Sequence, residues 1–392
     1  MKITMLGSGS YRSSLSIRLV ALGRQLTKLG WDVTIIVPSA DKYNNFTKEN
    51  INNDGAVSVI QPWQPATASS FLNLLPYLLT STIALLSRRT DLVYLYKPTP
   101  ITILGLIPGL LFQVPVILDL DDLGSEVMRA ENQSLLQSGL VSLCEQLAIK
   151  YSRAIVVTST FLKHQIQARY PNKDVLVLPN GVDTVQYPLR PSRQLRPAVY
   201  YFGMVNRLSL IEPLLRAVPS VLKSVPTARF TIIGGGSALD EAKLLVKNLG
   251  VSYAVTFTGM TDMLGIVSFT EFGDIGVCYQ PDVDTVKAAS NMKVFQYMAL
   301  STVPVVSAVG ELPTYIDDGR AGVSVKADDS QALGEALISL LQNKRQRTQY
   351  ALRARQLSET TYAWSSITLQ LSSFLSEYAH RYQSPSRRRS EL

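Results

Sequence analysis

The sequence predicts an α/β protein built from two Rossmann-like, doubly wound parallel-sheet domains. Short apolar runs rich in β-branched residues alternate with amphipathic helical patterns along nearly all of the 392 residues, which is typical of βαβ units. The alternation stops once, at the proline- and arginine-rich segment 188–198, and then resumes. Because open parallel sheets bind ligands at the carboxyl ends of their strands, we expect the domains to face each other across a cleft.

The first domain is expected at 1–187 and the second at 199–364, with 188–198 as the linker. Strands of the first domain are predicted at 2–6, 32–37, 56–60, 92–96, 114–119, 154–157 and 175–178, with helices at 14–29 and 135–152 among those between them. Strands of the second domain are predicted at 199–202, 229–233, 255–257, 275–279 and 303–306, with helices at 211–223, at 238–249 and after Asn291.

The composition indicates filled cores rather than disorder, because 46% of the residues are hydrophobic and 17% are charged. Cys144 and Cys278 form no metal-ligand or redox pattern, and only two histidines are present, which excludes a His-rich metal site. The first apolar segment, 3–6, is too short for a signal peptide. We therefore expect a cytoplasmic protein with reduced cysteines.

The net charge is +8, and the tail 381–392 contributes +3 of it through four arginines and one glutamate. Such a tail either attracts an anionic membrane surface, at roughly 1 kcal/mol per charge, or is a solvated end. Nucleic acid is not expected as a partner, because the rest of the chain carries no strong basic stripe.

Two stretches contain no charged residue, 55–87 and 98–118. Three prolines interrupt the second stretch, which disfavours a helix that spans a membrane. In the first, a helix at 71–86 would have one apolar face and an uncharged opposite face. We expect a buried helix or one that lies against a membrane surface, and hence peripheral membrane contact rather than a transmembrane span.

The segment "GSGSYR", 7–12, follows the first predicted strand and precedes a helix. Gly7 and Gly9 begin a dinucleotide fingerprint, but Arg12 occupies the place of its third glycine, so a dehydrogenase is disfavoured. A glycine loop at a helix N-terminus is suited to phosphate or a sugar hydroxyl. The alternative is an ordinary tight turn between strand and helix.

The segment "LDLDDLG", 118–124, places three carboxylates at the end of a strand. Asp119, Asp121 and Asp122 could pair with substrate hydroxyls, accept a proton or bind a metal, and one of them could cap the next helix. We favour hydroxyl binding over metal.

Further glycine turns follow strands at "IIGGGSALDEA", 232–242, and at "FTGM", 257–260. Glycine there allows a ligand to approach the backbone closely. After Ser290 and Asn291, either of which can cap a helix, Lys293 and Gln296 lie one turn apart on its polar edge. The helix N-terminus and Lys293 are suited to a diphosphate and Gln296 to a ribose, and the alternative is a solvated helix edge.

Three motifs together resemble the family 4 glycosyltransferases, which have the GT-B fold. They are "VLPNGVD" at 177–183, "NMKVFQYMALSTVPVVSAVGELPTYIDDG" at 291–319 and "YAW" at 362–364. The resemblance covers residues 1 to about 380. It implies a last helix, 365–380, that crosses back to the first domain, followed by the basic tail 381–392.

The resemblance implies a retaining, hexosyltransferase-type enzyme that moves a sugar from a nucleotide-diphosphate sugar to a polysaccharide or glycolipid, without a metal or other cofactor. The donor would bind the second domain and the acceptor the first. The residues expected in catalysis are Arg207, Lys293 and Asp121. Those expected to bind the donor are Gly7, Gly9, Gly203, Gly235, Gly259, Ser290, Asn291, Met292 and Gln296. Those expected to bind the acceptor are Ser10, Arg12, Asp119 and Asp122.

The chain also departs from the family pattern. Two glutamates that usually stand eight positions apart are replaced by Ala288 and Gln296. An amide can still bind a ribose hydroxyl, but without charge assistance. Two alternatives therefore remain: a catalytically weak or inactive GT-B protein that binds nucleotide sugar or glycan as a partner subunit, and an epimerase or phosphorylase on the same scaffold.

Overall fold

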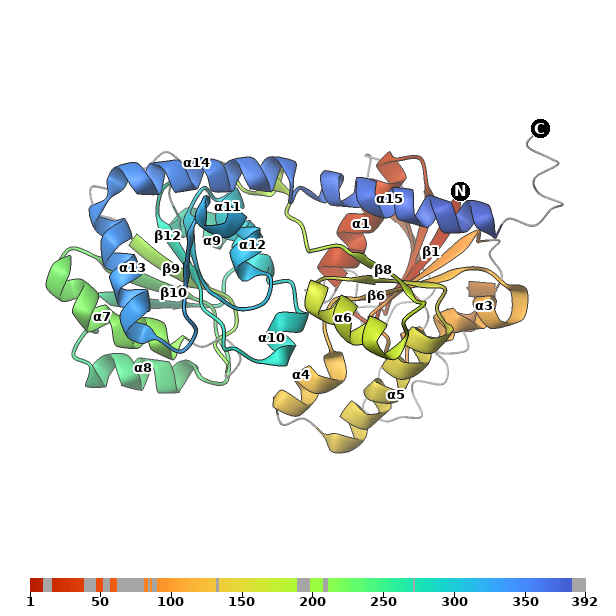
Figure 1. Ribbon diagram of the computed structural model, residues 1–392, viewed down its shortest axis with the longest axis horizontal. Helices are drawn as coiled ribbons and strands as arrows, with labels where there is room; N and C mark the ends of the chain where they lie inside the picture. Colours follow the sequence, from red (N-terminus) through yellow and green to blue (C-terminus); the bar gives the residue numbers. More distant parts are fainter. Residues whose placement is uncertain are drawn as a thin grey trace. The chain divides into compact units, whose positions relative to one another are not determined.

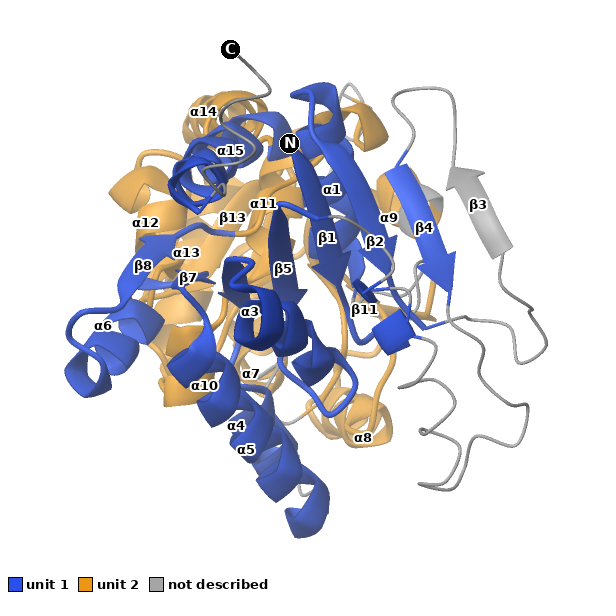
Figure 2. Cartoon of the chain, turned by 90° about the vertical axis from the view of Figure 1, so that its right-hand side faces the viewer, with its two compact units in different colours: residues 1–179, 364–392 blue, residues 180–363 orange. Residues whose placement is uncertain are grey.

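The computed structural model describes residues 1–9, 16–38, 57–61, 81–83, 85–86, 90–131, 134–188, 198–206, 211–270 and 272–382, and the backbone of 47–51. The chain forms two compact units (Figure 2). Unit 1 contains Met1–Pro179 and Trp364–Leu392, and unit 2 contains Asn180–Ala363.

The described sheet of unit 1 has eight strands in the order β3-β4-β2-β1-β5-β6-β7-β8. They are β1 Lys2–Leu6, β2 Asp32–Ile36, β3 Thr47–Ile51, β4 Val57–Gln61, β5 Leu92–Tyr96, β6 Val116–Leu120, β7 Ala154–Val157 and β8 Asp174–Val177. Neighbouring strands pair in parallel, except that β3 is antiparallel to β4. Because the sheet is parallel, the end of β6, where the three aspartates stand, lies beside the end of β5.

The helices of unit 1 that are labelled in Figure 1 connect these strands or flank them. They are α1 Ile17–Lys28, α3 Ile107–Phe112, α4 Gly124–Ala130, α5 Leu135–Tyr151, α6 Thr160–Arg169 and α15 Trp364–Arg381, and a 3-10 turn, Thr102–Leu106, precedes α3. β5 and β6 are buried along their whole length, so helices cover both of their faces.

The described sheet of unit 2 has six parallel strands in the order β11-β10-β9-β12-β13-β14. They are β9 Ala198–Phe202, β10 Arg229–Ile233, β11 Val255–Gly259, β12 Ile275–Cys278, β13 Val303–Ser307 and β14 Val323–Val325. The helices are α7 Glu212–Ser224, α8 Leu239–Asn248, α9 Met263–Phe269, α10 Asp284–Ala288, α11 Met292–Ala299, α12 Leu312–Tyr315, α13 Ser330–Gln342 and α14 Lys344–Thr360, with 3-10 turns at Thr184–Gln186 and Asp317–Gly319.

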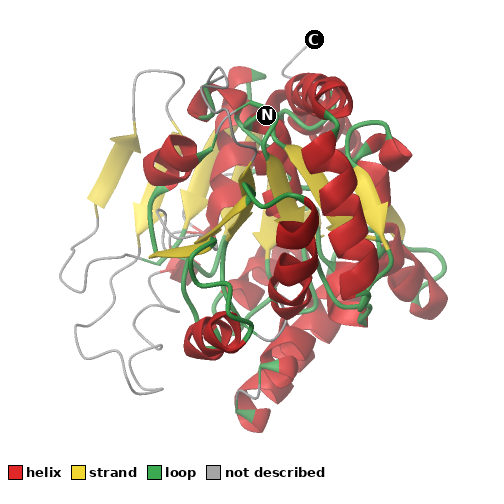
Figure 3. Ribbon diagram, turned by 90° about the vertical axis from the view of Figure 1, so that its left-hand side faces the viewer, coloured by secondary structure: helices red, strands yellow, loops and turns green. Residues whose placement is uncertain are grey.

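Side chains alternate between the two faces of the unit 2 sheet and build a core on each. Tyr201 on β9 faces the core shared with α7, α8 and α13, whereas Tyr200 and Phe202 face the core shared with α11 and α14. Figure 3 shows strands between layers of helices. This two-sided covering is what the near-continuous apolar strands predicted.

The contacts divide the chain at Pro179, before the boundary that we expected at 187. The segment after Pro179 packs with unit 2 because the backbone N–H of Val182 donates to the Tyr362 carbonyl at 2.8 Å and Tyr187 enters the α11 core. The expected linker, 188–198, falls largely outside the described residues. α15 belongs to unit 1, where Trp31 donates to Ser372 at 2.9 Å.

The expected helix at 71–86 lies mostly outside the described residues, so its membrane contact stays a prediction. Of the helices that the structure describes, none combines the length and the apolar character needed to cross a membrane. Among the strands that the structure describes, β3 and β14 were not predicted. β14 has only three residues, and polar residues fill most of β3.

Candidate active site

The N-terminus of α11 is held by two side chains that the sequence predicted as caps. Asn291 is the N-cap, and its Oδ1 accepts the backbone N–H of Lys293 at 3.2 Å. Ser290 is buried; its Oγ accepts the backbone N–H of Asn180 at 3.0 Å, and its carbonyl accepts the Asn180 side-chain amide at 2.9 Å. Ser290 therefore positions the helix. The N–H groups of Lys293 and Val294 both donate to Asn291, so the helix end offers an anion its dipole and the N–H of Met292.

Lys293 extends from the first turn of α11 over the end of β9. Its Nζ donates to Tyr201 Oη at 3.0 Å and lies 4.5 Å from the centroid of that ring. Among the described residues, no carboxylate forms an ion pair with it. A cation beside a helix N-terminus without a described counter-charge produces a positive potential at this point of the unit.

Gly203 is the residue that makes room for this lysine. Its φ is +129°, and a Cβ built there would lie 2.4 Å from Lys293 Cε. Any other residue would meet both the strained backbone and the lysine stem.

The other glycine turns meet at the carboxyl ends of β9, β10 and β11. The N–H of Val205 donates to the Gly235 carbonyl at 2.9 Å, and the N–H of Gly234 donates to the Gly259 carbonyl at 2.9 Å. The structure thus brings together the predicted Gly203, Gly235 and Gly259.

At Gly234 and Gly236 any side chain would collide with neighbouring backbone atoms. These two glycines were not singled out from the sequence. Their φ values are +138° and +151°, and a Cβ would lie 2.0 Å from the Gly203 carbonyl oxygen or 2.4 Å from that of Val205. At Gly235 the nearest atom would be Met260 Cγ at 3.4 Å. A side chain at Gly235 would therefore meet less obstruction than one at either neighbour, although Gly235 itself is buried.

Gln296 lies one turn further along α11 and has a partner within the unit. Its Nε2 donates to Tyr187 Oη at 2.9 Å. Burial raises the pKa of Tyr187, so its hydroxyl stays protonated. Ala288, at the position of the other family glutamate, ends α10 and is fully buried. Arg207, the second expected phosphate ligand, lies outside the described residues.

In unit 1, Asp119 belongs to the core and not to an accessible site. It is 0% exposed, and its Oδ2 accepts Arg18 Nε at 2.8 Å and Tyr94 Oη at 2.6 Å. The same guanidinium donates to the Pro179 and Leu178 carbonyls, each at 3.0 Å. The prediction that Asp119 binds an acceptor is wrong, because a fully buried carboxylate cannot meet one.

Asp121 and Asp122 are partly exposed and pair with a lysine that sequence reasoning missed. Lys97 Nζ lies 3.1 Å from Asp121 Oδ1 and 2.9 Å from Asp122 Oδ2, and Tyr96 Oη donates to Asp121 Oδ2 at 2.7 Å. Burial lowers the pKa of Lys97, but the two carboxylates raise it more, so the lysine stays charged. Lys97 has a φ of +53° at the end of β5, and its place opposite the aspartates follows from the parallel β5–β6 pair.

Gly7 and Gly9 also lie in unit 1, whereas the glycine turns described above lie in unit 2. A Cβ at Gly7 would lie 2.6 Å from Leu19 Cδ2, and the Gly9 carbonyl accepts Ser16 Oγ at 2.8 Å. Packing of α1 thus explains Gly7 without a ligand. Ser10 and Arg12 lie outside the described residues.

Within the described residues, no group of three His, Cys, Asp or Glu side chains could hold a metal ion. The three aspartates are directed to different partners: Asp119 to Arg18, and the other two to Lys97.

Two family models match this chain: glycosyl transferases group 1 over residues 196–343, and the glycosyl transferase 4-like domain over residues 15–181. Together they cover most of both units, including the α11 site and the aspartates. The chain belongs to the family 4 glycosyltransferases. It is a glycosyltransferase of the GT-B fold.

Curated relatives of this glycosyltransferase include two proteins of Mycolicibacterium smegmatis. Alpha-maltose-1-phosphate synthase is 26% identical over 68% of the chain and 74% of its own length. GDP-mannose-dependent alpha-(1-6)-phosphatidylinositol monomannoside mannosyltransferase is 25% identical over 55% of the chain, and the match spans 61% of its own length.

Solved structures support the fold. Sucrose-phosphate synthase from Thermosynechococcus elongatus superposes with a TM-score of 0.72 at 17% identity, covering 96% of this chain and 98% of that one. Anabaena HepE in complex with UDP-glucose gives a TM-score of 0.68 at 15% identity, covering 96% and 100%.

Proposed function

We propose that this glycosyltransferase moves a sugar from a nucleotide-diphosphate sugar to a polysaccharide or glycolipid acceptor, with retention of anomeric configuration. The observation that carries the proposal is Lys293, a cation without a described carboxylate partner, held over Gly203 at the N-terminus of α11. A diphosphate matches this arrangement in charge and in hydrogen-bonding capacity. Arg207 is proposed as a second phosphate ligand.

The donor class is supported by what the relatives and neighbours are named for. One relative is GDP-mannose-dependent, and one neighbour was solved with UDP-glucose. Both donors contain the same diphosphate, and their bases and sugars differ. The proposal therefore extends to a nucleoside diphosphate sugar and leaves the base and sugar to experiment.

The proposed chemistry is electrostatic stabilisation of the leaving group. As the bond from the sugar to the diphosphate breaks, negative charge grows on the departing phosphate oxygens. Lys293 and the positive end of the α11 dipole are fixed before the reaction, so they stabilise this charge without reorganising. Asp121 is proposed as the group that accepts the acceptor proton, and Lys97, whose Nζ lies 3.1 Å from Asp121 Oδ1, would hold the carboxylate in place.

Gln296 is proposed to bind the ribose. Its amide nitrogen already donates to Tyr187, which leaves the side-chain oxygen to accept from a ribose hydroxyl. We propose no metal cofactor, since the positive charge that a metal would supply is assigned to Lys293 and Arg207. We also propose that this glycosyltransferase is cytoplasmic and contacts the membrane surface peripherally.

Release of nucleoside diphosphate from a panel that includes UDP-glucose and GDP-mannose tests the proposal. We expect one donor to be consumed far faster than the others, and consumption to rise when a lipid-linked or oligosaccharide acceptor is added. The anomeric configuration of the product, followed by NMR, tests retention. Inversion would refute the retaining assignment without touching the donor site.

A second candidate is a catalytically weak protein that binds nucleotide sugar as a partner subunit. Ala288 and Gln296 favour it, because both positions lack the carboxylate of the family pattern and Ala288 is fully buried. Tight binding of a nucleotide sugar with no turnover, with or without acceptor, would establish this candidate in place of the first.

A further inference from the structure

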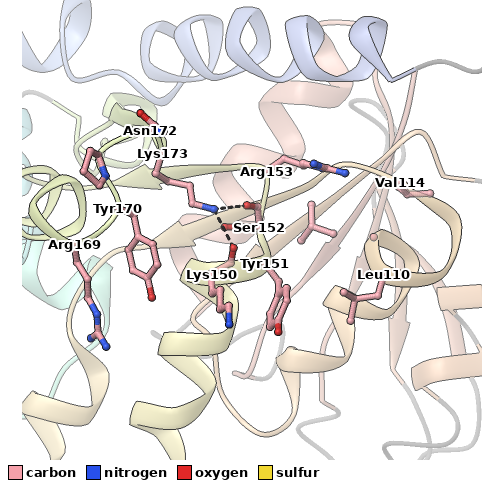
Figure 4. A pocket seen from close by; sticks show the side chains of 13 residues that line it. Leu110, Val114, Lys150, Tyr151, Ser152, Arg153, Arg169, Tyr170, Asn172 and Lys173 are labelled. Carbon is pink, nitrogen blue, oxygen red and sulfur yellow. Dashed lines mark hydrogen bonds between the residues drawn. The ribbon is translucent and has the colours of Figure 1, made fainter.

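A pocket lies in unit 1 at the amino ends of three parallel strands (Figure 4). Val114, Arg153 and Lys173 line it and come shortly before β6, β7 and β8. Its volume is about 620 Å³. Asp121 follows β6 and therefore stands at the opposite edge of the same sheet, so this pocket is separate from the residues proposed for catalysis.

The pocket is positively charged. Four of its lining residues are cations, Lys150, Arg153, Arg169 and Lys173, and the described residues that line it include no carboxylate. None of the four forms an ion pair within the described part of the chain; three of them lie near tyrosine rings instead. The positive charge is thus left for an external anion to neutralise.

Lys173 is the cation held most firmly. Its Nζ donates to the Ser152 carbonyl at 2.6 Å and to the Lys150 carbonyl at 3.2 Å, as Figure 4 shows. Burial lowers the pKa of Lys173, and the charge of Arg153 lowers it further. An anion in the pocket would stabilise both cations at once.

An apolar ridge borders this charge. The last three residues of α3, Leu110, Leu111 and Phe112, are 60%, 64% and 64% exposed, and Leu110 lines the pocket. Tyr151, which also lines it, is 46% exposed. Consecutive large apolar side chains with this exposure mark a surface that contacts something other than water.

The four cations and the apolar ridge together favour a membrane over a soluble anion as the ligand. A soluble anion would explain the cations but leave the ridge in water. A bilayer with anionic lipids provides both partners, phosphates at the level of the head groups and acyl chains just beneath them. Arg153 lies 5.1 Å from the Tyr382 ring. Three arginines follow Tyr382 in the sequence, Arg387, Arg388 and Arg389, outside the described residues.

We propose that this face of unit 1 docks on an anionic membrane, with a lipid phosphate in the pocket and residues 110–112 among the head groups and upper acyl chains. The inference deepens the proposed peripheral contact and rests on that part of the proposed function, not on sugar transfer. It assigns the contact to residues other than the helix 71–86 expected from the sequence.

Vesicle co-sedimentation of the full chain without nucleotide sugar tests the part of the proposal that concerns the charged pocket. We expect binding to vesicles that contain phosphatidylglycerol and little binding to pure phosphatidylcholine. The double variant Lys150→Glu, Arg153→Glu should weaken binding by about tenfold or more. The matched control is Lys243→Glu, Lys247→Glu on α8 of unit 2, which changes the net charge equally and should bind nearly as well as the native chain.

The apolar half is tested by Leu111→Ser, Phe112→Ser against Leu244→Ser, Leu352→Ser, which alters two equally exposed apolar residues of unit 2. We expect about a tenfold loss for the first pair only. Far-UV circular dichroism of each variant verifies folding. If the control variant loses as much vesicle binding as Leu111→Ser, Phe112→Ser, or if the latter loses none, the insertion of residues 110–112 is overturned.

Two further results would overturn the proposal. One is equal binding of the native chain to neutral and anionic vesicles. The other is complete competition by millimolar inorganic phosphate together with an unaffected ridge variant, which would identify the pocket as a site for a free anion. Nucleoside diphosphate release measured without vesicles remains an independent result, so failure here and failure of the proposed sugar transfer are distinguishable.

Discussion

Gln296 and Tyr187 form a hydrogen bond in which either side chain can donate. The amide donates in the native chain, but a tyrosine hydroxyl can reverse its role toward a carboxylate. The contact therefore fixes the position of Gln296 without excluding an acidic residue there.

We expect Gln296→Glu to keep or tighten donor binding and to change the melting temperature little. Tyr187 can donate to the new carboxylate, which then offers a charge-assisted acceptor to the ribose. A thermal melt with and without UDP or GDP measures both effects. A large loss of stability with an unchanged response to nucleotide would remove the ribose assignment.

Gly203→Ala should reduce both stability and nucleotide binding. The φ of +129° costs about 1–3 kcal/mol for a non-glycine residue. The alanine methyl would also displace Lys293, because it would lie 2.4 Å from Lys293 Cε. Gly250→Ala is the matched control, because Gly250 also has a positive φ, +70°, but nothing lies within 4 Å of its Cβ. Chemical denaturation and calorimetry should show a stability loss in both variants and a binding loss in Gly203→Ala alone.

For individual residues, the sequence predicted which side chains of α11 are polar, but not their hydrogen-bond partners. Spacing placed Lys293 and Gln296 on one helix edge. Their partners, Tyr201 and Tyr187, come from segments about a hundred residues away, and periodicity along a single helix contains no information about such contacts. Asp119 was misassigned for the same reason, since burial by Arg18 is a tertiary effect.

α1 is joined to the ends of β6 and β8 by one guanidinium. Arg18 donates to Asp119 and to the carbonyls of Leu178 and Pro179. Arg18→Met should lower the free energy of unfolding by about 3–5 kcal/mol, because it leaves a buried carboxylate unpaired. Urea denaturation measures this loss of unfolding free energy. The double variant Arg18→Met, Asp119→Asn should recover part of it, because the buried charge is removed. If stability does not recover, the unpaired Asp119 carboxylate is not the cause of the loss.

The same pair predicts a pH dependence. Burial raises the pKa of folded Asp119 above the unfolded value of 3.8, and Arg18 opposes that rise. The folded state therefore binds the proton more tightly, so this group's contribution to stability declines as the pH rises from about 4 through the raised pKa. In Arg18→Met the opposing charge is gone, so the decline should extend to higher pH than in the native chain. Parallel pH profiles of unfolding free energy for the two proteins would contradict this account.

Most of the strands could be predicted, because the buried strands of parallel sheets are nearly continuous apolar runs. The place where the chain leaves unit 1 could not. Proline and arginine marked 188–198, but the segment that begins at Asn180 already packs with unit 2 through Ser290, Tyr362 and the α11 core. A boundary defined by packing is not visible in composition.

For the whole molecule, metal removal should leave sugar transfer intact. The described residues include no cluster suited to a metal, and the charge of the leaving group is assigned to Lys293, Arg207 and α11. Activity before and after treatment with EDTA, with added magnesium or manganese as the control, measures this. Loss that either metal restores would refute the metal-independent mechanism.

The central claim is that a nucleoside diphosphate binds unit 2 at the N-terminus of α11 through Lys293. Calorimetric titration of the native chain, Lys293→Ala and the surface control Lys243→Ala with UDP and with GDP tests it most directly. We predict that Lys293→Ala weakens the preferred nucleotide by about 1.5–3 kcal/mol, the range for a charge-assisted contact, and that Lys243→Ala does not. Equal affinity of Lys293→Ala and the native chain for both nucleotides would contradict the placement of the donor site.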